Sequence, residues 1–271
     1  DIKRENANID GDTAMGTMLK YGSEGAKQFY EMFVLHPDHA KAHREGDIHI
    51  HDLDFLTLTT TCCQIDLKKL FKGGFSTGHG FLREPNDIRS YAALACIAIQ
   101  SNQNDQHGGQ SIPNFDYSMA DGVKKTYRRL YWNNMGKSMD ILCGTEDGET
   151  KILEIGEAIR RDCGIEPAMA DDNGYREKEA EYLREFLTDD QIQTIQKVAV
   201  SYSQKEIRRA TYQAMEALIH NLNTMHSRAG AQIPFSSINY GTDTSPEGRL
   251  VIESVLKATE AGLGNGETAI F

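Results

Sequence analysis

The spacing of apolar residues along the chain alternates between a helical period and a strand-like period. Long segments with apolar side chains three or four positions apart are typical of helices that bury one face. Asp87 stands directly before one such segment and is suited to cap it, and residues 244–247 are typical of a helix start. The expected helices are residues 12–46, with interruptions at Gly22 and Gly25; 88 to about 101; 115–131; 176–226; and a helix with Pro246 in its first turn.

The strand-like segments lie between these helices. Residues 47–61 are rich in apolar and β-branched side chains and are expected to form a strand that runs into a loop; residues 233–240 return to strand character. Glycines predict a turn at 73–80 and a loop with unusual backbone angles at 107–111, whereas 132–175 is expected to be irregular. Alternation of strand and helix with long spacings favours the α/β class over separate domains.

Composition narrows the class of protein. The chain has 271 residues and a net charge of −11, whereas a protein that coats nucleic acid is usually basic, so no nucleic-acid partner is expected. No apolar run approaches the ~20 residues of a membrane span, so no membrane partner is expected. The chain opens on Asp1 without an initiator Met and stops at Phe271 within an apolar run, and we expect it to be a fragment.

Five cysteines, an odd number with no CxxC pair, indicate reduced thiols in a cytoplasmic protein. Cys96 lies inside an apolar helix and is expected to be a small buried hydrophobe. The adjacent Cys62 and Cys63 differ, because they follow a run of threonines at the expected end of a strand, where α/β folds place their sites. From spacing alone, packing and thiol chemistry both remain open for this pair.

The motif His49-x-His51-Asp52 also has two interpretations. Alternate positions on a strand would point both imidazoles to one face, as two ligands of a zinc site require. Two ligands are not a complete site, and further histidines in a strand-end pattern are absent from the sequence. A polar pocket wall is therefore favoured over a metal-dependent hydrolase, and no metal is expected. Asp52 would then orient an imidazole or cap a turn.

Two other segments could contact a ligand. The loop from Gln106 to Ser111 has consecutive glycines whose N–H groups could converge on an anion. It is not a Walker loop, and the sequence alone favours an ordinary helix-ending turn. The cations of residues 124–129 could contact phosphates or form a solvated helix face.

Several motifs in one order resemble a known family, the anaerobic (class III, glycyl-radical) ribonucleoside-triphosphate reductases. The segment HIHDLDFLTLTTTCCQIDLKKLF carries the closest likeness, and the likeness extends over nearly the whole chain. At the end, Ala269 stands where that family usually has Pro. The other segments that carry it are RENANIDGD, QSNQNDQHGGQS, SRAGAQIPFSSINYGTDTSPEGR and GLGNGETAIF.

The resemblance implies a fold and a set of site residues. Residues 1–271 would be the N-terminal part of a ten-stranded α/β barrel, made of two five-stranded halves with a finger loop through the centre. Cys62 would face the ribose and work against a second cysteine that holds a transient thiyl radical, while Cys63 would pack. Substrate-binding residues would be His49, His51, Gly108, Gly109, Ser111, Gln232 and Ser236. Effector-binding residues would be Arg83, Lys124, Arg128 and Arg129, although Arg83 replaces an acidic residue of some relatives.

The resemblance also implies cofactors and partners. The full-length protein that contains this chain would reduce ribonucleoside triphosphates and act as a homodimer through the helices at 88–101 and 115–131. It would respond to dNTP or ATP effectors and receive its glycyl radical from a radical-SAM activase. The glycyl radical residue and a four-cysteine zinc site would lie outside this chain, so the chain alone is expected to be inactive. The alternatives left open are the hydrolase built on His49 and His51 and a non-catalytic dNTP-binding dimerisation module.

Overall fold

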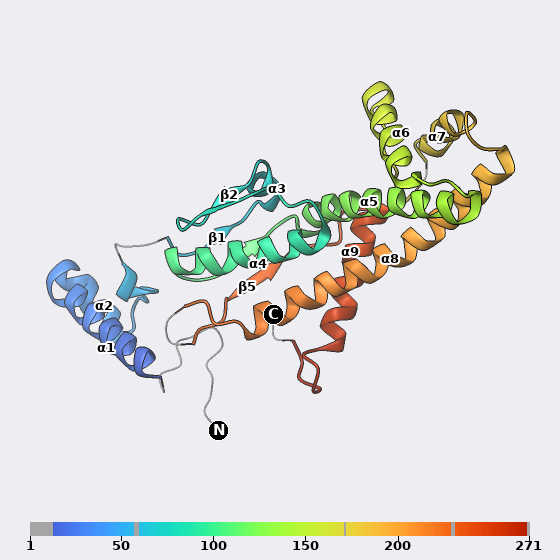
Figure 1. Cartoon of the computed structure of the whole chain (residues 1–271). Helices are drawn as coiled ribbons and strands as arrows, with labels where there is room; N and C mark the ends of the chain where they lie inside the picture. Colours follow the sequence, from blue (N-terminus) through green and yellow to red (C-terminus); the bar gives the residue numbers. More distant parts are fainter. Residues whose placement is uncertain (1–12, 57–59, 171, 229–230, 270–271) are drawn as a thin grey trace.

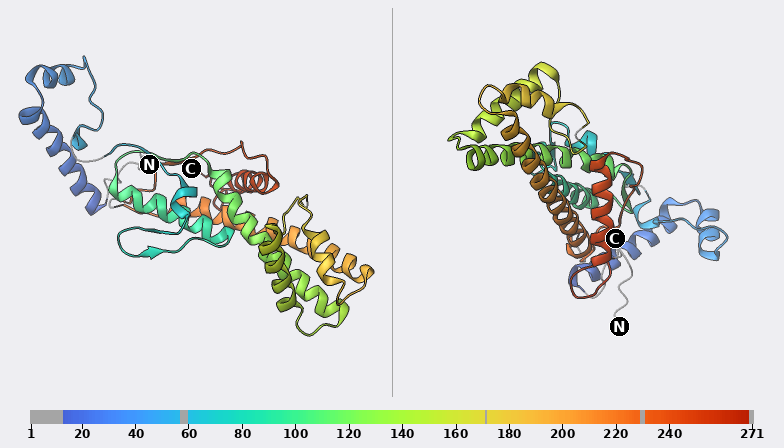
Figure 2. Two further views of the ribbon diagram at one scale, coloured as in Figure 1. Left: turned by 90° about the horizontal axis from the view of Figure 1, so that it is seen from above. Right: turned by 90° about the vertical axis from the view of Figure 1, so that its right-hand side faces the viewer.

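The computed structural model describes residues 13–56, 60–170, 172–228 and 231–269. The chain is elongated, with a small N-terminal helical lobe at one end, a parallel sheet near the middle and two short helices at the far end (Figures 1 and 2). The elements, in order, are α1 Ala14–Phe29, a π-helical turn Tyr30–Val34, α2 Pro37–Glu45, a 3₁₀ turn Leu53–Phe55, β1 Cys63–Gln64, α3 Leu67–Phe71, β2 Phe75–Ser76, β3 Phe81–Leu82, α4 Ile88–Asp105, β4 Gln110–Ile112, α5 Phe115–Cys143, α6 Gly148–Cys163, α7 Tyr175–Leu183, α8 Asp189–Thr224, β5 Ser236–Ile238 and α9 Pro246–Ala261.

The N-terminal lobe corrects two expectations. Helix α1 continues through Gly22 and Gly25, because an interior glycine costs only about 1 kcal/mol and does not by itself end a helix. The break comes instead at His36, directly before Pro37, where proline disfavours helical geometry in the residue ahead of it. The expected strand at 47–61 is wrong for residues 47–56: a strand needs a partner, and this segment has none among the described residues. Residues 57–59 lie outside the described part.

Three short strands form a parallel sheet in the order β1-β4-β5. Helices cross from one strand to the next, as parallel pairing requires. The expected strand at 233–240 is confirmed at its centre as β5, and the glycine-rich segment 73–80 joins the antiparallel pair β2 and β3. The α/β expectation therefore holds as a mixed fold that is mainly helical with small sheets, and the described residues contain five strands rather than a barrel.

The helical body confirms the cap predicted at Asp87 and the helix start predicted at 244–247, and it corrects part of one segment. Asp87 caps α4 and Ser245 caps α9, each through a side-chain oxygen that accepts a backbone N–H. Of the residues 132–175 expected to be irregular, 132–143 continue α5 and 148–163 form α6, whereas 144–147, 164–170 and 172–174 are irregular. The glycines within these helices mark close helix packing rather than turns: a Cβ on Gly136 would lie 2.5 Å from Glu149 Cα, and one on Gly156 would lie 2.7 Å from the Trp132 ring.

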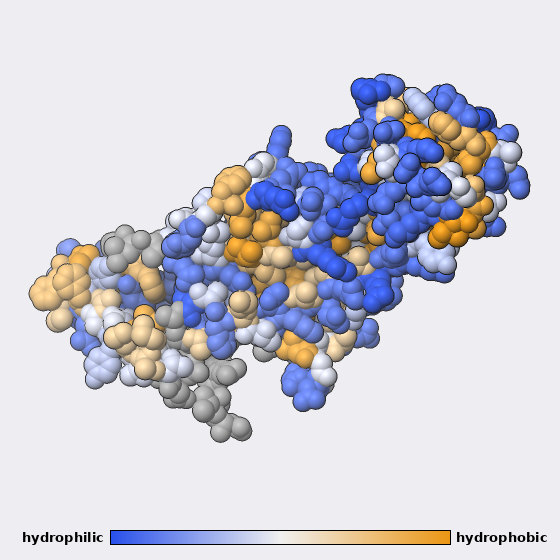
Figure 3. Space-filling view, viewed as in Figure 1, coloured by the Kyte–Doolittle hydropathy of each residue, from blue (hydrophilic) through white to orange (hydrophobic). Residues whose placement is uncertain are grey.

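Helices α4, α5, α8 and α9 pack together and bury most of the apolar side chains. Cys96 is buried as expected, and burial raises the pKa of its thiol to about 12. By contrast, the N-terminal lobe leaves large apolar side chains exposed, and Figure 3 shows hydrophobic residues gathered at that end of the molecule. Such a surface commonly marks a contact with another protein segment. Among the described residues, no helix is both long and apolar enough to cross a membrane.

One buried carboxyl is expected to make stability depend on pH. Glu179 in α7 is fully buried, and it accepts hydrogen bonds from Tyr131 Oη at 2.7 Å and Gln196 Nε2 at 2.9 Å. Burial raises the pKa of this carboxyl to about 7, although these hydrogen bonds oppose the rise. The folded state therefore favours the neutral acid. The contribution of Glu179 to stability is complete below the pKa of this carboxyl in the unfolded chain, near 4.5, and it falls as the pH rises to about 7.

The free energy of unfolding by urea is therefore expected to fall by about 3 kcal/mol between pH 4.5 and 7 from this group alone. Glu179→Gln removes the ionisable group and should flatten this part of the pH profile. Glu177→Gln, an exposed position on the same helix, is the matched control and should keep the slope of the unchanged protein. Equal slopes in Glu179→Gln and the unchanged protein would contradict a raised pKa for Glu179.

Candidate functional site

The two adjacent cysteines point to opposite faces of the sheet. The Cys63 N–H donates to Gly109 O at 3.2 Å, which joins β1 to β4, and the Cys63 thiol accepts a hydrogen bond from Asn102 Nδ2 of α4 at 3.1 Å. Because successive side chains of an extended segment alternate, Cys62 and Gln64 lie on the other face, and both are exposed. The packing interpretation of Cys63 agrees with this geometry, and Cys62 is left as the accessible thiol.

Gly108 closes over Cys62 from the neighbouring loop. Its φ is +92°, a backbone conformation that favours glycine, and a Cβ there would lie 2.3 Å from Thr61 O and 3.2 Å from Cys62 Sγ. The next residue, Gly109, makes a looser contact with Phe235, whose ring would lie 3.2 Å from a Cβ. Close approach of the loop to the Cys62 segment therefore requires glycine at 108, whereas a small shift of the Phe235 side chain would make room at 109.

A pocket of about 400 Å³ opens on this face of the sheet. Ser111 of β4 pairs in register with Gln64 of β1 and Ser237 of β5, so these three polar side chains share the face that carries Cys62. Phe235 is half exposed at the rim. The residues that line the pocket are Cys62, Cys63, Gln64, Gly109, Gln110, Ser111, Phe235, Ser236 and Ser237.

Two predicted substrate residues have other surroundings. Ser236 pairs in register with Gln110, whose side chain donates to Ile99 O of α4, so the Ser236 hydroxyl belongs to the α4 side of the sheet, where it is buried. The Gln232 Oε1 atom accepts from Arg228 at 3.1 Å, and the Arg228 guanidinium also contacts the carbonyls of Gln103 and Gln106 at the end of α4. Ser237 is the exposed serine of β5, and sequence reasoning missed it because its position depends on the strand register.

The histidines of the HIHD motif lie outside this pocket's lining. His49 and His51 are both exposed, with ring centroids 5.8 Å apart. The Asp52 carboxylate lies 3.2 Å from His51 Nε2 and 3.0 Å from His107 Nε2, so it contacts two imidazoles. Among the residues the structure describes, no three His, Cys, Asp or Glu side chains are grouped as metal ligands. The grouping needed for a hydrolase based on His49 and His51 is thus not present in that part of the chain.

The predicted effector cations divide between two sides of α5. Arg128 forms an ion pair with Glu166 and, with exposed Lys124, lines a recess that faces α3 and the segment after α6. Arg129 points the other way and contacts Asp87 Oδ2 at 3.3 Å. Arg83 is exposed just after β3 and makes no ion pair within the described residues. The four cations therefore do not converge on one pocket.

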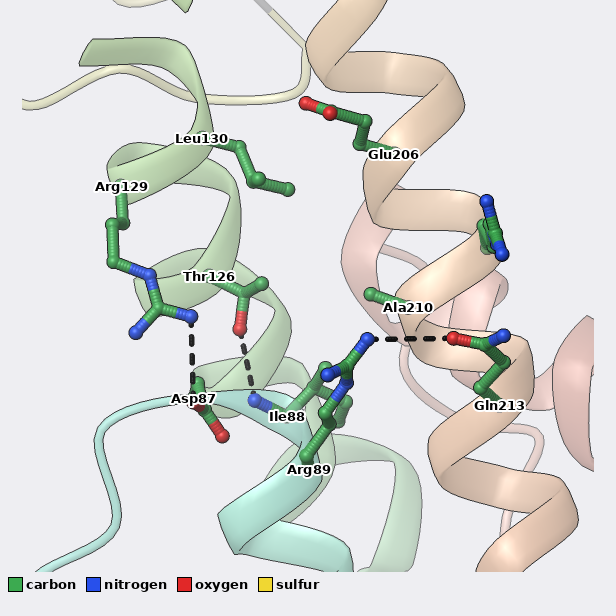
Figure 4. A pocket seen from close by; sticks show the side chains of 10 residues that line it. Asp87, Ile88, Arg89, Thr126, Arg129, Leu130, Glu206, Ala210 and Gln213 are labelled. Carbon is green, nitrogen blue, oxygen red and sulfur yellow. Dashed lines mark hydrogen bonds and ion pairs between the residues drawn. The ribbon is translucent and has the colours of Figure 1, made fainter. Parts of the chain in front are cut away.

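Arg129 instead belongs to a second pocket, of about 420 Å³, between α4, α5 and α8. Figure 4 shows Arg129 from α5 and Arg89 from α4 beside this space, with Thr126 bonded to the first N–H of α4 between them. Arg209 of α8 also lines the pocket, so three arginines line it in a chain of net charge −11, together with the carboxylates of Asp87 and Glu206. Sequence reasoning missed Arg89 and Arg209, because no local pattern connects residues on three different helices.

Comparison with known proteins identifies a family that this chain matches. Over residues 5–271 the chain matches the family described as anaerobic ribonucleoside-triphosphate reductase. Over its whole length it is 26% identical to a protein of that name from Enterobacteria phage T4, 28% to one from Salmonella typhimurium and 27% to one from Escherichia coli. The chain spans 36%, 30% and 30% of those proteins, about a third of their length.

Proposed function

This chain belongs to the anaerobic ribonucleoside-triphosphate reductase family, and from that premise we propose that it is part of a larger enzyme that reduces ribonucleoside triphosphates to 2′-deoxyribonucleoside triphosphates. We call that full-length protein the parent. In this proposal residues 1–271 form the N-terminal part of a ten-stranded barrel, and the parent is a cytoplasmic homodimer activated by a radical-SAM enzyme. The chain alone is expected to lack turnover.

The observation that carries the proposal is the exposed Cys62 thiol, which lines the pocket on the open face of the sheet. The reaction replaces the 2′-hydroxyl of the ribose by hydrogen, and the hydroxyl leaves as water. A thiol suits this task because its S–H bond is weak and its sulfur is readily oxidised. Cys62 would supply hydrogen to the 2′-carbon, and the reductant, formate or a thioredoxin-like protein, would restore the electrons.

The remaining pocket residues would bind and orient the substrate. Ser111, with Gln64 and Ser237 beside it, offers hydroxyl and amide groups to the ribose and phosphates. Gly108 and Gly109 would let backbone approach the substrate closely, and His49, His51, Gln232 and Ser236 remain proposed contacts in the complete barrel. When present, the glycyl radical would supply the first hydrogen-atom abstraction. We place the glycyl residue and a zinc site outside this chain.

Product analysis of the parent tests this proposal. The purified protein would be activated anaerobically and incubated with each ribonucleoside triphosphate and reductant, and nucleotides would be separated by liquid chromatography. Appearance of the 2′-deoxynucleoside triphosphate in proportion to glycyl radical content supports the reductase. Tight dNTP binding with no product from fully activated protein would instead indicate the non-catalytic binding module.

We further propose that effector phosphates bind beside Arg129, in the pocket between α4, α5 and α8. Three arginines line this pocket, and a guanidinium group suits a phosphate because it can form paired hydrogen bonds to phosphate oxygens. A bound phosphate would replace the Asp87 carboxylate as the partner of Arg129. Most apolar residues of α4 are buried against α5 and α8 of the same chain, while Ala93 and Ile97 stay exposed. These two positions, with the outer face of α5, are the surface we propose for the dimer contact.

Arg129→Glu is expected to weaken dNTP effector binding by about 10- to 100-fold, because it replaces a charge-assisted hydrogen bond by repulsion. Isothermal titration of the parent with each dNTP would measure the affinity. Lys124→Glu changes a cation on the other side of α5 and should weaken effector binding less. Arg161→Glu changes an exposed arginine of α6 and is the matched control. An unchanged affinity in Arg129→Glu, or a larger loss in Lys124→Glu, would move the effector site away from this pocket.

A further inference from the structure

Asp52 lies between two histidines from distant parts of the chain. One carboxylate oxygen is 3.0 Å from His107 Nε2, and the other is 3.2 Å from His51 Nε2. The side chains of Asp52 and His107 are 21% and 24% exposed, whereas that of His51 is 81% exposed. Because water competes more strongly for exposed polar groups, the contact between Asp52 and His107 is the more significant of the two.

The 3₁₀ turn that begins after Asp52 holds His107 from two sides. The Phe55 ring stacks on the imidazole with centroids 4.1 Å apart, while the Asp52 carboxylate contacts the ring edge. Asp52 has φ +49°, and Asp52 and Ala231 are the two described non-glycine residues with positive φ. This conformation costs an L residue roughly 1–2 kcal/mol, so surrounding contacts must maintain it.

His107 in turn is tied to the segment that carries Cys62. Its backbone N–H donates to Thr60 O at 3.0 Å, and the next residue is Gly108, which contacts Thr61 O and Cys62 Sγ so closely that no Cβ fits. The position of the His107 ring and the close approach of Gly108 to Cys62 are thus linked through adjacent backbone. The contact with Asp52 also favours the imidazole tautomer with its proton on Nε2.

We propose that Asp52 is a positioning residue for the Cys62 thiol and that it acts through His107. The 3₁₀ turn, the imidazole and the loop around Gly108 then form one continuous support from the N-terminal lobe to the sheet. The inference rests on the proposed role of Cys62, but the geometry of the thiol can be measured without turnover.

The test compares three variants of the parent. Asp52→Gly removes the carboxylate and accepts positive φ without strain, so it isolates the side chain from the backbone. Asp52→Asn keeps an acceptor oxygen for His107 and also tolerates this conformation. Asp54→Gly is the matched control in the same turn, because the Asp54 carboxylate accepts from Ser23 instead. Alkylation of Cys62 by iodoacetamide is followed by peptide mass spectrometry, with exposed Cys163 as internal reference.

In Asp52→Gly we expect Cys62 alkylation to become about fivefold faster, since Gly108 would no longer pack against one side of the exposed thiol. We expect kcat per glycyl radical to fall by about 10- to 100-fold with KM changed less than about threefold, and Asp52→Asn to recover most of it. Alkylation and kcat in Asp52→Gly within about twofold of Asp54→Gly would overturn the inference. A parent without any turnover would refute the proposed function, while the alkylation comparison would still decide the role of Asp52.

Discussion

Replacement of Cys62 by serine in the parent is expected to abolish deoxynucleotide formation while the glycyl radical can still be installed. Serine keeps the size and exposure of the side chain, but its O–H bond is too strong to supply the hydrogen and its oxygen is not oxidised. We expect kcat to fall by about 1000-fold or more, because the group acts in the chemical steps rather than in folding. Product chromatography and electron paramagnetic resonance of the radical measure the two quantities.

Cys63→Ser is the matched control, one position along the same segment. The Cys63 sulfur only accepts a hydrogen bond from Asn102 on the α4 side, and a serine hydroxyl can accept the same bond. This variant should keep most of the turnover. Near-native turnover in Cys62→Ser, or loss of turnover in Cys63→Ser alone, would show that the two thiols have been assigned in the wrong order.

Gly108→Ala is expected to have the second largest effect. The added methyl group would lie 2.3 Å from Thr61 O, a backbone atom, so the two loops must separate. We expect turnover to fall by about 100-fold through displacement of Cys62, since a misplacement near 1 Å can cost this much. Steady-state kinetics per glycyl radical, with thermal unfolding to measure stability, would record both consequences.

Gly78→Ala separates the effect of a positive φ from the effect of close approach to another backbone atom. Gly78 has φ +91°, nearly the same as Gly108, but no heavy atom lies within 4 Å of its hypothetical Cβ. It should therefore show the cost of positive φ, about 1 kcal/mol in stability, with little change in turnover. Equal turnover in Gly108→Ala and Gly78→Ala would mean that the close approach of Gly108 to Cys62 is not needed for activity.

Much of the local structure was predictable because its causes are local. Asp87 and the Ser245-Pro246 pair define helix starts through side chains that bond N–H groups three residues away, and the alternating apolar pattern placed β5 near residues 233–240. Cys96 could be predicted as buried from the apolar helix around it. The strand expected at 47–56 failed because a strand is stabilised by pairing with a distant segment, which the pattern of one segment does not reveal.

In the candidate site, too, some features could be predicted from the sequence and others could not. The sequence by itself determined that Cys62 and Cys63 are adjacent thiols, and its motifs indicated the family. Which thiol faces the pocket was decided by the register of β1 on β4, since a shift by one residue would exchange their faces. Three features were decided only by tertiary structure: the need for Gly108, the contact between Asp52 and His107, and the placement of Arg89, Arg129 and Arg209 around one pocket. Each depends on how separate elements pack.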